Sequence, residues 1–130
     1  NVPVLKTIKI GDAKIRDISR LNTNSVERTL TIMRINDLFS LPVIDKERNF
    51  LGIVLMSDIK DSPPNDRIEK YVRKGVAYVS PNSTGEEIWN VLASTKSTWI
   101  PVVQKGKFLG VILLNDFVEL YREKLKTFFE

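Results

Sequence analysis

The sequence predicts an α/β fold of the mixed α+β kind, made of two similar halves that each pack helices on a small sheet. Three observations lead to this prediction: a segment that occurs twice, a helical apolar period ahead of each copy, and paired apolar runs within each copy. The copies are LPVIDKERNFLGIVLMSDI, residues 41–59, and IPVVQKGKFLGVILLNDF, residues 100–117. Such self-similarity indicates an internal duplication. The identical pairs, in order, are Pro42/Pro101, Val43/Val102, Lys46/Lys105, Phe50/Phe108, Leu51/Leu109, Gly52/Gly110, Leu55/Leu113 and Asp58/Asp116.

An amphipathic helix is expected ahead of each copy. Apolar or small residues recur there at the i, i+3, i+4, i+7 spacing of one buried helix face. Ser25 and Thr84 precede these stretches as N-cap residues, and Thr84 with Glu87 makes a capping box. The predicted core faces are Val26, Thr29, Leu30 and Met33 in the first helix, and Gly85, Ile88, Trp89 and Leu92 in the second.

Each copy itself is expected to form a hairpin followed by a helix. Two short apolar runs flank a charged turn of hairpin length. Ser57 or Asn115 is then expected to cap a helix that carries Asp58 or Asp116 in its first turn, where a negative charge favours the helix dipole. The predicted strands are residues 41–44, 51–56, 100–103 and 109–114, with a further strand over 75–80 and a short counterpart over 20–23.

Two prolines mark the boundary between the halves. The segment DSPPNDR, residues 61–67, is rich in the residues typical of turns and linkers. We therefore expect a first repeat with an N-terminal strand segment over residues 1–62, a linker over 63–67, and a second repeat over 68–130 that ends in an extended helix. A half of this size has little core of its own, so the halves are expected to fold as one pseudo-symmetric protein.

Composition limits the chemistry. The chain of 130 residues is 42% hydrophobic and 28% charged, as in a globular protein. It contains no cysteine and no histidine, which excludes disulfides, thiolate nucleophiles, the usual zinc sites and histidine-based triads. No apolar run approaches the roughly 20 residues of a membrane span, and no signal peptide is evident. A cytoplasmic location without membrane contact is expected, and Asn1 in place of Met suggests a piece of a longer protein.

The positive charge leaves nucleic acid open as a partner, although an unfavoured one. The net charge is +4, with a pI of about 9.4. The basic residues are scattered among acidic ones, as on an ordinary solvated surface. The densest basic stretch, Lys6 to Arg16, alternates in the manner of an edge strand.

Each half of the chain contains a helix, then "LPVID" or "IPVVQ", then "LGIVLMSDI" or "LGVILLNDF". In this repeated order the chain resembles a tandem pair of cystathionine β-synthase (CBS) domains, a Bateman module. The resemblance covers nearly the whole chain. It implies a regulatory module, not an enzyme, that binds an adenine nucleotide or related adenosyl metabolite in clefts between the repeats and commonly forms a homodimer. No cofactor is required, and AMP, ADP, ATP or S-adenosylmethionine is the implied regulatory ligand.

The resemblance also implies a set of ligand-binding positions. The aspartate that accepts hydrogen bonds from ribose hydroxyls corresponds to Asp58 and Asp116. The serine or threonine three residues earlier is replaced by Leu55 and Leu113. The remaining positions are Phe39 and Ser40 in the first copy and Thr98 and Trp99 in the second, before the proline, and Val76, Ala77 and Tyr78 at the adenine edge.

Several departures from that pattern keep other interpretations open. No charge precedes either proline, so phosphate would need another cation, such as Arg34, Lys60 or Lys96. Trp99 either stacks on a purine or packs in the protein or at a dimer contact. The two aspartates could serve only as helix-stabilising residues, and the two leucines could belong to the core.

The sequence leaves two other functions open beside ligand sensing. The first is a degenerate CBS pair that dimerises or docks a partner without a small molecule. The apolar face of the last helix, which extends beyond the needs of one domain, favours dimerisation. The second, an enzyme with paired carboxylates, is disfavoured because no general-base constellation is visible and the resemblance puts the aspartates in separate clefts.

Overall fold

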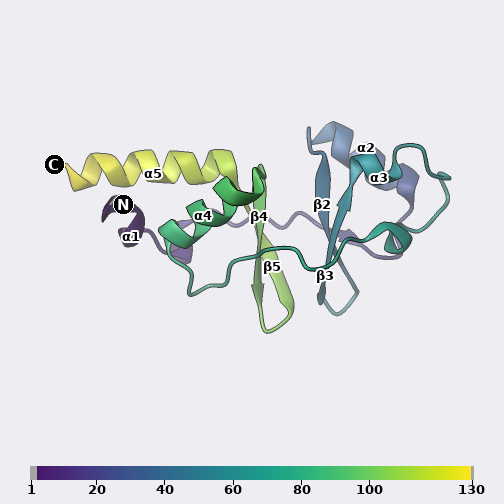
Figure 1. Cartoon of the computed structure of the whole chain (residues 1–130), viewed down its shortest axis with the longest axis horizontal. Helices are drawn as coiled ribbons and strands as arrows, with labels where there is room; N and C mark the ends of the chain where they lie inside the picture. The colour runs from purple at the N-terminus through teal and green to yellow at the C-terminus, as the bar shows by residue number, and fades with distance from the viewer. Residues whose placement is uncertain (1–2, 130) are drawn as a thin grey trace. The chain divides into compact units, whose positions relative to one another are not determined.

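The computed structural model describes residues 3–129, which form two compact units (Figure 1). Unit 1 contains residues 3–17, 77–105 and 109–129, and unit 2 contains residues 18–76 and 106–108. The compact units therefore differ from the contiguous ranges 1–62 and 68–130. The N-terminal segment joins the unit of the second copy, and residues 68–76 join the unit of the first.

Unit 2 is a three-stranded sheet with helices. It contains β1 (Arg20–Leu21), α2 (Val26–Ile35), β2 (Ser40–Ile44), β3 (Phe50–Leu55), α3 (Met56–Ile59) and the 3-10 helix η2 (Ile68–Tyr71). The sheet order is β1-β2-β3, with β1 parallel and β3 antiparallel to β2. The buried face of α2 packs with the strands, and the core residues are Val26, Leu30, Met33, Leu41, Val43, Val54, Ile59 and Ile68.

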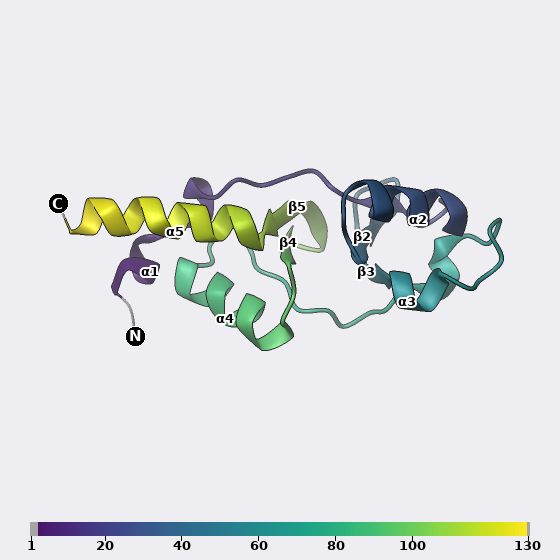
Figure 2. The same ribbon diagram turned by 90° about the horizontal axis from the view of Figure 1, so that it is seen from above.

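Unit 1 repeats this hairpin-and-helix arrangement. It contains α1 (Pro3–Thr7), the 3-10 helix η1 (Ile10–Asp12), α4 (Gly85–Thr95), β4 (Trp99–Gln104), most of β5 (Lys107–Leu113) and α5 (Leu114–Phe128). Helix α5 runs beside α1 and α4 in both views (Figures 1 and 2). The core residues are Ile8, Ile10, Val79, Ile88, Leu92, Ile100, Val102, Ile112 and Phe117.

The expected helix starts are confirmed. The Ser25 side chain accepts a hydrogen bond from the backbone N–H of Arg28, and Thr84 with Glu87 forms the reciprocal capping box. The predicted apolar faces are buried, with one exception: Trp89 is 42% exposed. The four strands of the two hairpins lie within a residue or two of their expected bounds.

Three local expectations are wrong. Residues 6–16 are not an edge strand, because α1 and η1 occupy much of the segment and only Lys9 and Arg16 make isolated bridges. Ser57 and Asn115 do not cap the helices that follow the hairpins. Those helices begin directly after β3 and β5, so the N-cap positions fall on Leu55 and Leu113, which donate and accept no side-chain cap hydrogen bond.

The strand expected over residues 75–80 is reduced to one parallel bridge. Val79 forms a single parallel bridge with Val102, and the pairing does not extend into a longer ladder. In unit 2 the equivalent contact is the short strand β1, where Arg20 lies opposite Val43. The short counterpart over 20–23 is thus present as β1, and both units add a parallel partner to the first strand of the hairpin.

Candidate functional site

In unit 2 the end of the hairpin brings one predicted group of residues together. The first residue of α3, Met56, donates its backbone N–H to the carbonyl of Phe39 at 2.8 Å. Ser40 lies opposite Leu55 in the β2–β3 register. Asp58 follows in the only turn of α3, so Phe39, Ser40, Leu55 and Asp58 share one end of the sheet. We call this group half-site 2.

The equivalent group forms in unit 1. The backbone N–H of Leu114, the first residue of α5, donates to the carbonyl of Thr98 at 2.8 Å. Thr98 and Trp99 therefore lie next to the β5–α5 junction, where Leu113 ends the strand and Asp116 stands in the first helical turn. We call this group half-site 1. The duplicated sequence thus folds into duplicated local geometry.

The residues before the two prolines differ in exposure. Phe39 is 70% exposed, whereas Trp99 is only 6% exposed. Burial of the Trp99 ring leaves little of its face for a purine, which supports the packing interpretation of this residue. Leu55 and Leu113 are half-buried, so neither is a core residue in the strict sense.

The predicted adenine-edge residues are divided between the units. Val76 is the last residue of its segment in unit 2, and Ala77 and Tyr78 begin the next segment of unit 1. None of the three belongs to a helix or a strand. Tyr78 is 53% exposed. Their role at an adenine edge stays a prediction.

An arginine that the sequence analysis did not single out holds each aspartate. In half-site 2, Arg73 donates from Nε to Oδ2 of Asp58 at 2.7 Å and from Nη2 to Oδ1 at 2.9 Å. In half-site 1, Arg16 donates from Nε to Oδ2 of Asp116 at 2.7 Å and from Nη2 to Oδ1 at 3.1 Å. Both pairs are bidentate, the strongest geometry available to arginine and carboxylate.

The backbone of each arginine is fixed against the second hairpin strand of its unit. Arg73 and Ile53 exchange two backbone hydrogen bonds of 2.8 and 3.0 Å, and Arg16 and Val111 exchange two of 2.8 and 2.9 Å. These bridges place the guanidinium groups beside the helix that follows the strand. The arginines are thus positioned by backbone pairing as well as by the carboxylates.

Each backbone bridge depends on the glycine just before it in the strand. Gly52 and Gly110 adopt φ angles of +141° and +146°, which L side chains rarely adopt. A Cβ on Gly52 would overlap the carbonyl of Arg73, and one on Gly110 would lie 2.8 Å from the carbonyl oxygen of Arg16. The duplicated glycine therefore allows the arginine-bearing segment to approach the strand.

The arginines keep both carboxyl groups ionised. Hydrogen bonds from Arg73 and Arg16 lower the pKa of Asp58 and Asp116 respectively, against an opposing effect of desolvation. The same bonds raise the pKa of each arginine. At neutral pH each half-site is therefore a carboxylate, which can only accept hydrogen bonds, beside a guanidinium, which can only donate them.

This arrangement suits binding better than catalysis. A carboxylate has about four lone-pair positions, and the arginine of each half-site uses two of them. A pair of vicinal hydroxyls can therefore still donate hydrogen bonds to the carboxylate. The sequence offered a signal for the arginines, because an apolar residue followed by arginine precedes each copy, in KIRD and YVRK. The signal does not connect an arginine to its aspartate, because Arg16 and Asp116 are 100 residues apart.

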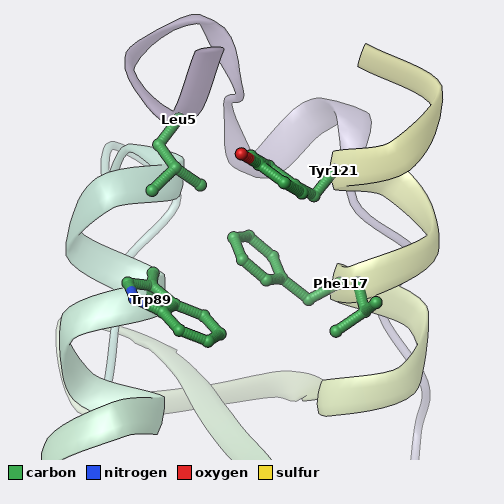
Figure 3. A pocket seen from close by; sticks show the side chains of 5 residues that line it. Leu5, Trp89, Phe117 and Tyr121 are labelled. Carbon is green, nitrogen blue, oxygen red and sulfur yellow. The ribbon is translucent and has the colours of Figure 1, made fainter. Parts of the chain in front are cut away.

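Unit 1 also contains an apolar pocket between three helices (Figure 3). Its volume is about 340 Å³, and it is lined by Leu5 of α1, Trp89 of α4 and three residues of α5. The rings of Trp89 and Phe117 stack at 6.5 Å between centroids and 16° between planes. The residues from α5 are Phe117, Val118 and Tyr121.

Within residues 3–129 no three acidic, histidine or cysteine residues gather closely enough to hold a metal ion. No helix in the same range combines the length and the apolar character that crossing a membrane requires.

Comparison with known proteins identifies the duplicated unit. A family model described as CBS domain matches residues 22–64 and again residues 68–123. The magnesium transporter MgtE of Thermus thermophilus is 22% identical over 102 residues, which are 74% of this chain and 23% of the transporter. The chain thus spans less than a quarter of the length of that relative.

Solved structures show the same fold. A CBS domain pair/ACT domain protein of Thermotoga maritima superposes with a TM-score of 0.81 and 21% identity, over 91% of this chain and 99% of that one. CBSX2, solved in complex with AMP, superposes with a TM-score of 0.73 and 19% identity, over 89% of this chain and 97% of that one.

Proposed function

Because the chain belongs to the CBS domain family and carries the domain twice, we propose that it is a regulatory module that binds an adenosine-containing nucleotide through Asp58 and Asp116. The observation that carries the proposal is the repeated geometry of the two half-sites. In each, an ionised carboxylate stands in the first turn of a helix, with part of its surface open to solvent. Ribose offers a matching pair of vicinal hydroxyl donors.

The geometry favours recognition of a ligand over its chemical conversion. The carboxylate of each half-site is paired with arginine and stays ionised, so it is a poor proton donor near neutral pH. Its pKa is moved away from neutrality, opposite to what a general acid needs. Binding of a ligand to one or both half-sites can then be coupled to a neighbouring domain or partner by a shift in population.

Calorimetric titration tests the proposal. The chain is titrated with AMP, ADP, ATP, adenosine and S-adenosylmethionine, and Asp58→Ala, Asp116→Ala and the double variant are titrated with any compound that binds. We expect saturable binding by the parent and a loss of about tenfold or more in the relevant aspartate variant, since hydrogen bonds to a charged acceptor are lost. Asp61→Ala, at an exposed carboxyl outside the half-sites, is the matched control. Equal affinity in all variants would remove the role of the aspartates.

A second candidate function is dimerisation or partner docking without a small molecule. The apolar pocket between α1, α4 and α5 and the exposed rings near the end of α5 favour it. Phe128 is 50% and Phe129 is 76% exposed. Apolar surface of this kind commonly marks a protein interface. Absence of any nucleotide binding together with self-association would favour this candidate over the first.

A further inference from the structure

The arginines of both half-sites have hydrogen-bonding capacity that the aspartates do not use. A guanidinium carries five N–H donors. Arg73 gives Asp58 one donor from Nε and one from Nη2, and Arg16 gives Asp116 the same two. These bonds use the Nε–H and one N–H of Nη2, and leave the two N–H groups of Nη1 and one of Nη2 outside the contact with the aspartate. Three donors of each guanidinium are thus available beside the ion pair.

These free donors are both held in place and accessible. The backbone bridge and the bidentate carboxylate contact fix the plane of each guanidinium. The side chain of Arg73 is 61% exposed and that of Arg16 is 38% exposed. A planar guanidinium can bind two oxyanions on separate edges and thereby keep the two negative charges apart. An oxyanion of a ligand can therefore bind without displacing the aspartate.

We propose that Arg73 and Arg16 bind a phosphate group of the same nucleotide whose ribose hydroxyls donate hydrogen bonds to Asp58 and Asp116. Each half-site then selects phosphorylated over unphosphorylated nucleosides. This inference rests on the proposed function and narrows its ligand class. It also accounts for the lack of charge before the two prolines, since the cation comes from a different segment of the chain. Arg34, Lys60 and Lys96 are then not required for phosphate binding.

Removal of the arginine has a specific consequence for selectivity. In an Arg73→Gln variant the carboxylate of Asp58 remains, and it then lies near the phosphate without a compensating cation. Phosphate binding loses a charge-assisted contact and gains a like-charge repulsion. A neutral nucleoside meets neither effect. The variant should therefore lose affinity for AMP while affinity for adenosine stays nearly unchanged.

Parallel titrations with AMP and adenosine test this inference. We expect the parent to bind AMP at least about tenfold more tightly than adenosine, and Arg16→Gln/Arg73→Gln to lose that preference. Each single variant assigns the effect to one half-site. Arg73→Lys, which keeps the charge but not the fork of donors, should keep part of the preference. Lys74→Gln removes an exposed neighbouring cation and should change nothing, and thermal unfolding of every variant checks that it folds.

The outcomes separate this inference from the function on which it rests. An undiminished preference for AMP in the double arginine variant overturns the role of the arginines and leaves the nucleotide function intact. An equal fall in affinity for AMP and adenosine also overturns it, because the arginines would then only position the aspartates. Failure of the parent to bind any of the adenosine compounds overturns both.

Discussion

Arg73 and Asp58 are joined by two hydrogen bonds of 2.7 and 2.9 Å although they lie 15 positions apart and outside any common helix or strand. Arg16 and Asp116 make the same bidentate contact across 100 positions. In both units the arginine comes from an extended segment that pairs with the second hairpin strand, and the aspartate comes from the helix that follows that strand. The duplication thus includes a charged pair as well as a hairpin.

The charged pairs should make stability depend on acid pH. The pKa of Asp58 and of Asp116 is lowered in the folded chain, chiefly by hydrogen bonds from Arg73 and Arg16. A lowered carboxyl pKa gives a stabilisation that is fully present above the unfolded value of about 4, and that is lost as pH falls through the folded value.

Thermal unfolding of the parent and of Asp58→Asn/Asp116→Asn from pH 7 to pH 2 measures this effect. We expect the melting temperature of the parent to exceed that of the variant at pH 7, with a difference that narrows below about pH 4. A constant difference across the whole range would contradict the coupling. Asp61→Asn, at an exposed carboxyl outside the pairs, serves as the control.

Alanine at either duplicated glycine should destabilise the fold. Gly52→Ala and Gly110→Ala force a strained φ angle and bring a Cβ against the backbone of the arginine-bearing segment. We expect a loss of about 2 kcal/mol or more in the free energy of unfolding, measured in denaturant. Gly11→Ala is the control, because nothing lies within 4 Å of its new Cβ. Equal stabilities of Gly11→Ala and Gly52→Ala would show that the close approach is not needed.

Loss of either helix cap should cost stability in its own unit. Thr84→Ala removes the acceptor for the backbone N–H of Glu87, and Ser25→Ala removes the acceptor for that of Arg28. Each change should lower the free energy of unfolding by about 1 kcal/mol in denaturant titrations. Thr31→Ala, in the middle of α2 on its exposed face, should leave it nearly unchanged. A comparable loss in Thr31→Ala would show that the effect is not specific to caps.

Charged residues on the apolar face of α5 should reduce self-association. Leu125→Glu and Phe128→Glu place charge among the side chains that the dimer proposal buries, and we expect a smaller particle in analytical ultracentrifugation. Thr127→Glu introduces the same charge at an exposed position of the same helix and is the matched control. If the parent and all three variants sediment with one mass, α5 is not the association surface.

The sequence determined the parts of this protein that depend on local patterns. Capping residues and a 3.6-residue period located α2 and α4, and paired apolar runs around a charged turn located both hairpins, because caps, periodicity and turns act over a few residues. The internal repeat identified the family and the aspartates. The same local rules failed at Ser57 and Asn115, where the helix begins directly from the strand and leaves no room for a capping residue.

Tertiary structure alone decided how distant segments complete each half-site. It grouped residues 3–17 with the second copy and residues 68–76 with the first, and so brought Arg16 to Asp116 and Arg73 to Asp58. The sequence around an arginine does not indicate which carboxylate it will contact, because that contact depends on backbone pairing between distant segments and on a glycine that permits their close approach. Packing in the folded chain likewise decided the exposure of the two aromatic residues near the prolines, since Trp99 is 6% exposed and Phe39, one position earlier in its own copy, is 70% exposed.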